Sequence, residues 1–191
     1  MYDQHLSEAI HSVSNIPSYR EIKSSIDIFC NYSRVIFCTM GKSAFACRKI
    51  VYTARSYSLD WHDLDVCHAF HGDAGLIKEG DLLVFVSKSG ETKETIDVAK
   101  YFKKWETVSV TSDEKSSLTK MCKNNIHIPV ERESSPFGYA PMMSTTLYMI
   151  CLHGILCETV IRRKCSIQDY QRNHPAGSIG KKIIKDRERN K

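Results

Sequence analysis

One segment restricts the possible folds more than any other: a short apolar run, residues 81–87, that ends in a cluster of turn-forming residues. An uninterrupted apolar run of this length is typical of a β-strand buried on both faces, as in a parallel sheet. The next residues, Ser-Lys-Ser-Gly-Glu-Thr at 87–92, lead into helix-forming sequence. We therefore expect an α/β domain with this loop at the carboxyl edge of its sheet, where such folds bind ligands.

The rest of the chain alternates β-rich and helix-forming segments. This order predicts a parallel sheet with helices on both faces and right-handed crossovers. We expect one five-stranded, flavodoxin-like or Rossmann-like α/β domain at residues 31–182, between a helical segment at 1–30 and a basic tail at 183–191. The expected strands are residues 34–39, 57–61, 81–87, 106–110 and 125–130, and the expected helices are 43–55, 92–104, 116–123 and 141–161.

The charge distribution argues against nucleic acid as a partner. The net charge is +5, but residues 181–191 hold six basic and two acidic side chains and so account for +4 of it. We expect this tail to be solvated or frayed. A nucleic-acid surface needs basic residues spread over one face with aromatic residues among them.

Cysteine usage and the N-terminus favour the cytoplasm. The eight cysteines are scattered without a Cys-x-x-Cys pair, so no disulfide framework is expected. Residues 1–7 lack the basic-then-apolar order of a signal peptide. The longest apolar stretch, residues 147–156, is interrupted by His153 and Gly154, and no membrane-crossing segment is expected.

The loop at 87–92 is a candidate phosphate site. Hydroxyl groups and the free N–H groups at a helix start can hold a phosphate without a large cation. The same residues also suit an ordinary helix cap and tight turn, so composition leaves both interpretations open. The segment Gly41-Lys42-Ser43 resembles the end of a nucleotide-binding P-loop, but Ile36 stands where its first glycine belongs, which excludes a nucleotide triphosphatase.

Five motifs, in a fixed order over roughly residues 30–182, resemble the SIS-domain phosphosugar family, and within it the arabinose-5-phosphate isomerases. Members of this group commonly continue into a pair of CBS domains, and the resemblance here is to a form that lacks them. The motifs are Met-Gly-Lys-Ser at 40–43, His-Gly-Asp-Ala-Gly at 71–75, Ser-Lys-Ser-Gly-Glu-Thr at 87–92, Glu-Ser-Ser-Pro-Phe-Gly-Tyr-Ala-Pro at 133–141 and His-Pro-Ala-Gly-Ser-Ile-Gly at 174–180.

The resemblance implies an aldose–ketose isomerase that interconverts D-arabinose 5-phosphate and D-ribulose 5-phosphate through an enediol. It further implies a product used for 3-deoxy-D-manno-octulosonate (Kdo) and lipopolysaccharide synthesis. It implies a homo-oligomer, expected as a tetramer, with sites between subunits. The reaction needs no cofactor, but it needs a base, a second proton-transfer group and a stabiliser of the enediolate.

The motifs supply the candidates for these roles. Glu133 is the preferred base, although Glu is more often a solvated surface residue. The other catalytic candidates are Lys42, His71, Glu94 and His174, where His174 is expected to project into a site of its own subunit or of a neighbouring one. The expected phosphate or sugar contacts are Gly41, Ser43, Ser87, Ser89, Gly90, Glu91, Thr92, Ser144 and Thr145.

Two further hypotheses concern metal binding and rival functions. The cluster His62, Asp63, Asp65, Cys67, His68, His71 and Asp73 lacks a standard zinc-ligand spacing, so we expect no metal. The rival functions are another SIS isomerase, such as 6-phospho-3-hexuloisomerase, and a non-catalytic sensor of a phosphosugar or sugar nucleotide. The histidine-containing motifs argue against the first, and turnover would exclude the second.

Overall fold

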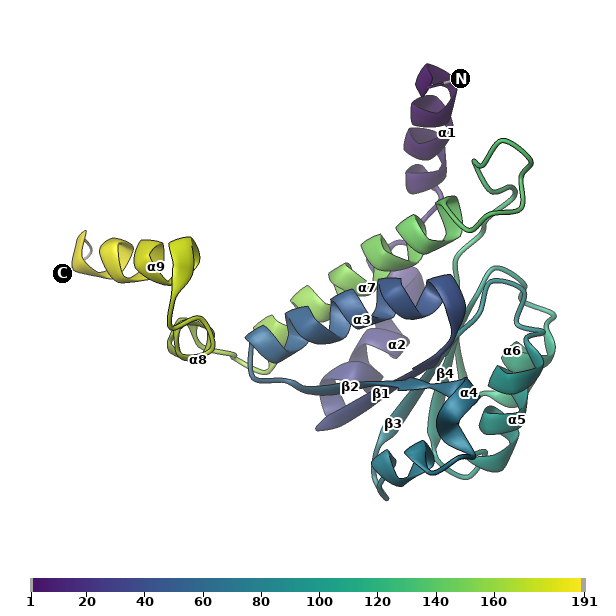
Figure 1. Cartoon of the computed structure of the whole chain (residues 1–191), viewed down its shortest axis with the longest axis horizontal. Helices are drawn as coiled ribbons and strands as arrows, with labels where there is room; N and C mark the ends of the chain where they lie inside the picture. Colours follow the sequence, from purple (N-terminus) through teal and green to yellow (C-terminus); the bar gives the residue numbers. More distant parts are fainter. Residues whose placement is uncertain (1, 190–191) are drawn as a thin grey trace.

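A five-stranded parallel sheet forms the centre of the protein, as the computed structural model shows for residues 2–189 (Figure 1). The strand order is β2-β1-β3-β4-β5, and each neighbouring pair is parallel. This confirms the predicted α/β class and the predicted sheet. The strands are β1 (Arg34–Thr39), β2 (Asp60–Asp65), β3 (Leu82–Val86), β4 (Glu106–Thr111) and β5 (Asn124–His127).

The second strand was predicted in the wrong place. Sequence analysis put it at residues 57–61, but the helix before it ends at Ser56, a turn follows, and the strand runs over Asp60–Asp65. This edge strand buries only Trp61 and Leu64, and its other residues are acidic or histidine. A strand with so few apolar residues carries almost no periodic signal, which explains the error.

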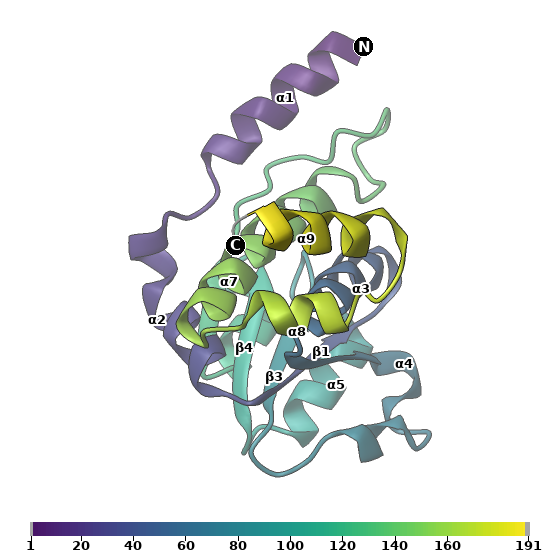
Figure 2. The same cartoon turned by 90° about the vertical axis from the view of Figure 1, so that its left-hand side faces the viewer.

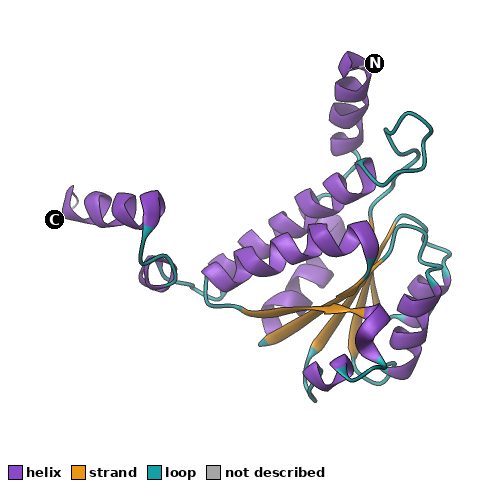
Figure 3. Cartoon of the chain, viewed as in Figure 1, coloured by secondary structure: helices purple, strands orange, loops and turns teal. Residues whose placement is uncertain are grey.

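Helices cover both faces of the sheet (Figure 3). One face packs against three helices, and the other against three shorter ones. Alternate residues of each inner strand enter the two cores, as the pleat requires: Phe37 lies in the first and Ile36 in the second. The helices of the first face are α2 (Tyr19–Asn31), α3 (Gly41–Ser56) and α7 (Met143–Arg162), and those of the second are α4 (Val66–Ala69), α5 (Lys93–Tyr101) and α6 (Ser117–Met121).

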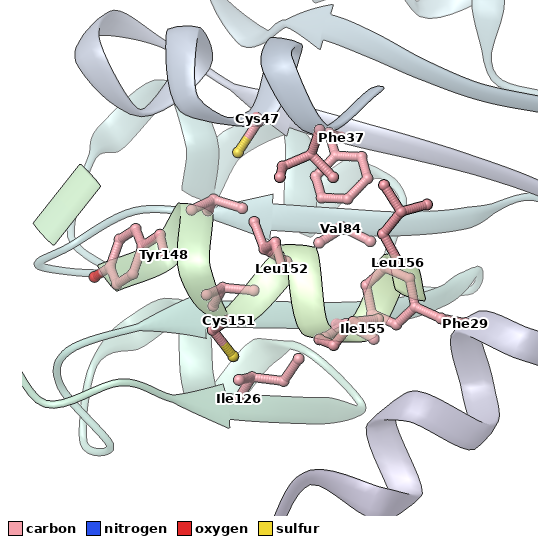
Figure 4. Close-up of a cluster of buried hydrophobic side chains, with 14 of the residues drawn as sticks. Phe29, Phe37, Cys47, Val84, Ile126, Tyr148, Cys151, Leu152, Ile155 and Leu156 are labelled. Atoms are coloured by element: carbon pink, nitrogen blue, oxygen red, sulfur yellow. The ribbon is translucent and has the colours of Figure 1, made fainter. Parts of the chain in front are cut away.

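Helix α7 is the central helix of the larger core. Its buried residues include Tyr148, Leu152 and Ile155, which belong to the same core cluster as Phe29 and Phe37 (Figure 4). By length and composition α7 passes the test for a membrane-spanning helix. Sequence analysis had judged only the shorter run at its centre. The apolar character of α7 is accounted for by its burial against the sheet.

The chain ends in helices on opposite sides of the domain. α1 (Tyr2–Ser14) stands beside the loop that precedes α7, while α8 (Ile167–Arg172) and α9 (Gly177–Arg189) extend from the other end of α7 (Figures 1 and 2). The predicted helical segment at 1–30 thus consists of α1 and α2. The basic tail is helical rather than frayed as far as Arg189, and α9 is exposed over most of its length.

The topology fixes where a ligand can bind. β1 and β3 are neighbours, yet the chain leaves β1 for α3 on one face and leaves β3 for α5 on the other. Such a switch point opens a crevice outside the carboxyl ends of the two strands. The Gly-Lys-Ser turn after β1 and the loop at 87–92 after β3 both lie at this edge.

Candidate active site

The loop at 87–92 is held together by its own hydroxyl groups. The Gly90 N–H donates to Ser87 Oγ over 3.2 Å, and the Glu91 N–H donates to Ser89 Oγ over 3.2 Å. Ser87 Oγ also lies 3.0 Å from Thr92 Oγ1. Because a hydroxyl that accepts from an N–H still has a proton to donate, these side chains can bind an anion without rearranging the loop.

Gly90 is required at the turn of this loop. Its φ of +62° lies in the left-handed region, and a Cβ placed there would lie 2.2 Å from Ser116 Oγ. Ser116 cannot easily move away, since its Oγ caps α6 by accepting from the Thr119 N–H. The loop therefore packs directly on the start of α6, and only a residue without a side chain fits.

Glu91, a predicted phosphate or sugar contact, has a hydrogen-bond partner on α6. Its carboxylate accepts from the Ser117 N–H over 2.7 Å, at the start of α6. This bond lowers the pKa of Glu91 below its usual value. The Glu91 side chain therefore joins the loop to α6, where an anionic group is favourable, and the hydroxyls of Ser87, Ser89 and Thr92 are left as the polar side chains for a phosphate.

Glu133 is a buried carboxylate at the start of α7, with 1% of its surface exposed. Its Oε2 accepts from the Met142 N–H over 2.9 Å and from the Ser144 N–H over 3.2 Å. Its Oε1 lies 3.1 Å from Lys88 Nζ. This second contact is an ion pair.

These contacts keep Glu133 ionised. Burial by itself raises the pKa of the carboxyl, but the hydrogen bonds from Ser144 and Met142 and the charge of Lys88 together lower it by more. The pKa of Glu133 therefore lies below its usual value. An ionised carboxylate can accept a proton at neutral pH. The hydrogen bonds from the start of α7 make Glu133 a weaker base than a carboxylate in water.

Sequence analysis missed Lys88 and two residues next to it in space. The Lys88 carbonyl accepts from the Ser112 N–H over 3.0 Å, and the Ser112 hydroxyl lies 2.7 Å from Tyr148 Oη on α7. Lys88 thus links the candidate phosphate loop to Glu133, and Ser112 links the end of β4 to α7. Lys88 was identifiable as the cation within the loop motif, whereas Ser112 and Tyr148 carried no sequence signal.

The turn after β1 brings another pair of predicted residues together. Gly41 begins α3 with a φ of +59°, and the side chain of Lys42 in its first turn is exposed. Lys42 lines a pocket of about 350 Å³ together with Thr145 and Thr146 of α7. The N-termini of α3 and α7 therefore share one hollow, in which Lys42 is the cation.

No hydrogen bond or ion pair joins the other three candidates to Glu133 within residues 2–189. His71 is exposed in the turn between α4 and the short 3-10 helix η1 (Asp73–Leu76), and Glu94 is exposed on the first turn of α5. His174 follows α8, stacks on Tyr170 with the ring centroids 4.2 Å apart and donates a hydrogen bond from Nδ1 to the Tyr170 carbonyl. The neighbouring Asn173 binds the end of α3, about 24 Å of helix away from Gly41.

The acidic and histidine residues of β2 are engaged in polar contacts within the protein. Asp63 lies 2.9 Å from Arg48 Nε, and His62 Nε2 lies 2.7 Å from Asp60 Oδ1. The Asp65 carboxylate accepts from the Cys67 N–H over 3.0 Å. Within residues 2–189 no three His, Cys, Asp or Glu side chains are grouped so as to hold a metal ion.

Comparisons with known proteins agree with this architecture. An "Arabinose 5-phosphate isomerase KpsF" of Escherichia coli is 33% identical over 152 residues, and an uncharacterized protein of Chlamydia muridarum is 35% identical over 158 residues. These alignments cover 78% and 81% of the chain but 46% and 48% of the relatives. The chain therefore spans about half the length of the curated relatives that it matches.

A solved structure extends the likeness to three dimensions. An E. coli CFT073 protein in complex with arabinose 5-phosphate superposes with a TM-score of 0.84 at 25% identity, covering 91% of this chain and 95% of that one. The SIS domain family model matches residues 28–156, from the end of α2 to within α7. With its five-stranded parallel sheet and its hydroxyl-rich loop at the switch point, the chain belongs to the SIS-domain family.

Proposed function

We propose that the chain is a phosphosugar aldose–ketose isomerase whose substrate pair is D-arabinose 5-phosphate and D-ribulose 5-phosphate. The observation that carries this proposal is the contact between the loop at 87–92 and Glu133. A preformed loop of hydroxyls and N–H groups is joined through Lys88 to a buried, ionised carboxylate, Glu133. Relatives at about one-third identity bear the name arabinose 5-phosphate isomerase, which supports this choice of sugar.

The loop at 87–92 is suited to the phosphate. Ser87, Ser89 and Thr92 offer hydroxyl protons, and α5 begins directly after the loop with unpaired N–H groups and the positive end of its dipole. Ser43 and Thr145 lie at the starts of α3 and α7 and are the further proposed contacts. Lys88 adds one positive charge close to the dianion.

Glu133 is the proposed base. Its carboxylate would take the proton from C2 of the open-chain aldose and return it to C1, while the electrons of the C2–H bond form the enediol. In the same sequence O1 gains a proton and O2 loses one, so that the carbonyl moves from C1 to C2. Lys42 is the proposed stabiliser of the negative charge on the enediolate.

A second group has to move the proton between the two oxygens. His71, Glu94 and His174 are the candidates. Because His174 lies at the opposite end of α3 from Gly41, it could reach Glu133 only in another copy of the chain. We therefore include a homo-oligomer, expected as a tetramer with shared sites, in the proposal.

The physiological setting is part of the same proposal. Ribulose 5-phosphate and arabinose 5-phosphate would be interconverted in the cytoplasm, where the eight free cysteines of the chain stay reduced. Supply of arabinose 5-phosphate to Kdo and lipopolysaccharide synthesis rests on the same reaction.

The test is turnover of arabinose 5-phosphate to ribulose 5-phosphate by the purified wild type and by Glu133→Gln. Glutamine keeps the shape of the side chain and an acceptor for the two N–H groups, but it cannot take up the proton. We expect a loss of at least about a hundredfold in kcat, since a positioned general base contributes about 10² to 10⁴. Glu131→Gln, an exposed carboxylate two residues away, is the matched control and should keep full activity.

The outcome also separates the rival functions. A wild type that binds the sugar phosphate without forming the ketose contradicts the isomerase and favours the sensor. Turnover of 6-phospho-3-hexulose in place of arabinose 5-phosphate would retain the isomerase and change its substrate.

A further inference from the structure

A pocket lies between α1 and the loop that carries Glu133. It has a volume of about 570 Å³ and is lined by one side of α1 and by residues 132–136. Both views place this loop beside α1 (Figures 1 and 2). No motif of the sequence assigned a role to α1, so the pocket joins an unassigned helix to the proposed base.

Unpaired polar atoms gather in this pocket. Within residues 2–189, five buried side-chain polar atoms lack a hydrogen-bond partner. Three of the five belong to residues that line the pocket: His5 Nδ1, Glu133 Oε1 and Ser134 Oγ. Glu133 Oε1 has the Lys88 ammonium at 3.1 Å, so His5 Nδ1 and Ser134 Oγ are the two of these atoms without a polar partner among the described residues. A buried polar atom without a partner costs about 1–3 kcal/mol, so two beside one cavity depart from ordinary packing.

The chemistry of these atoms points to hydroxyl groups. Glu133 Oε1 can only accept, Ser134 Oγ can donate and accept, and the imidazole of His5 can do either through Nδ1 according to its tautomer. A chain of hydroxyls satisfies all three kinds of atom. The charged residues that line the pocket are Glu8, Glu133 and Arg132, so two carboxylates face one cation and a phosphate dianion suits it less well than neutral hydroxyls.

The position of the pocket fits the geometry of a sugar phosphate. Lys88 approaches Glu133 Oε1 from the loop at 87–92, and the pocket borders the same carboxylate. A phosphate in the loop would therefore leave the carbon chain to extend past Glu133 toward α1. Glu133 would lie at the junction of the two ends, which is where the base has to be.

We propose that α1 closes the sugar-binding end of the site, with His5 and Ser134 binding hydroxyl groups of an open-chain polyol phosphate. This inference rests on the proposed function for the class of ligand. His5 is a binding residue here and is not assigned a proton-transfer step. The attachment of α1 is light: Ala9 packs against the core, whereas Leu6 and Ile10 are exposed. α1 can therefore move when the ligand enters.

Calorimetric titration with two unreactive ligands tests the proposal. D-arabinitol 5-phosphate has the phosphate and the hydroxyls but no carbonyl, and inorganic phosphate has no hydroxyl chain. We expect His5→Ala and Ser134→Ala each to weaken arabinitol 5-phosphate about threefold to tenfold, the range for one hydrogen bond. Neither variant should change the affinity for inorganic phosphate. His11→Ala, an exposed histidine of α1 that does not line the pocket, is the control and should bind like the wild type.

Each result decides the question. Unchanged arabinitol 5-phosphate affinity in both His5→Ala and Ser134→Ala overturns the proposal, as does an equal loss in His11→Ala. Binding with the expected losses but without wild-type turnover of arabinose 5-phosphate retains this site and rejects the isomerase. If the wild type binds arabinitol 5-phosphate no better than inorganic phosphate, the proposed hydroxyl-binding site is rejected. This holds whether or not the protein turns over arabinose 5-phosphate. Hydrogen exchange at α1 should slow on addition of arabinitol 5-phosphate, and unchanged exchange would contradict closure by α1.

Discussion

Two loops meet at the proposed active site, and they are built in opposite ways. The loop at 87–92 satisfies its polar groups internally and is fixed by Gly90 against Ser116. The loop at 131–142 leaves Glu133 Oε1 and Ser134 Oγ without hydrogen bonds, and its Phe137 is 85% exposed. The polar side chains of the first loop are bonded within the protein, whereas the second loop keeps hydrogen-bonding groups available for a ligand.

Among substitutions in the two loops, Gly90→Ala should have the largest effect on stability. The new methyl group would overlap Ser116, and alanine is strained at a φ of +62°. Together these effects should lower the free energy of unfolding by about 2–5 kcal/mol. Urea unfolding measures the change, and Gly75→Ala, where the added Cβ meets nothing within 4 Å, is the control. Equal stability of Gly90→Ala and the wild type would mean that the loop is not fixed as described.

Lys88→Met should have an intermediate effect, because it leaves Glu133 buried without its cation. We expect a loss of about 1–3 kcal/mol at pH 7. Lys93→Met removes only the exposed ion pair with Asp97 and should cost less than about 1 kcal/mol. If both substitutions lower the free energy of unfolding equally, the ion pair between Lys88 and Glu133 stabilises the fold no more than an exposed ion pair does.

The same variant has a defined pH dependence. The pKa of Glu133 is lowered in the folded protein, so its ionised form stabilises the fold above the usual pKa of about 4.5, and this contribution is lost as the pH falls through the lowered value. Lys88→Met should bring the pKa of Glu133 back up. Stability should then fall less steeply in acid, below about pH 4.5, than in the wild type, and parallel curves would contradict this account.

Phe137→Ser should have the smallest effect on the free protein. Its ring is exposed, and the change in unfolding free energy should stay within about 0.5 kcal/mol. Phe37→Ala, in the fully buried core, is the contrast and should cost about 3–5 kcal/mol. A loss above about 1 kcal/mol for Phe137→Ser would mean that the loop at 131–142 packs on the domain more firmly than its exposure indicates.

The parts of the fold that sequence predicted are those with a strong local signal. The buried run of β3 and the long apolar helix α7 could be located within a few residues. The edge strand β2 could not, because its acidic residues are held by arginines distant in the sequence, such as Arg48 with Asp63. Ion pairs of this kind are set by tertiary structure, and no periodicity in the sequence reports them.

The candidate site likewise contains residues that the sequence predicted and contacts that it did not. Motifs predicted Glu133 and the loop at 87–92 as site residues, since both depend on short, contiguous sequence. Lys88 and Glu133, which form an ion pair, are 45 residues apart in the sequence. His5, whose Nδ1 has no hydrogen-bond partner, is 128 residues from Glu133. Such pairs exist only once the chain has folded, so a single sequence contains no direct sign of them.

The double task of Glu133 has an evolutionary consequence. The carboxylate proposed as the base also holds the start of α7, the helix at the centre of the larger core. Selection for folding alone would therefore keep this glutamate in descendants that no longer needed a catalyst. A lineage that turned from isomerase to sensor would retain Glu133, and loss of function would show first at residues without a structural task, such as Lys42 or His71.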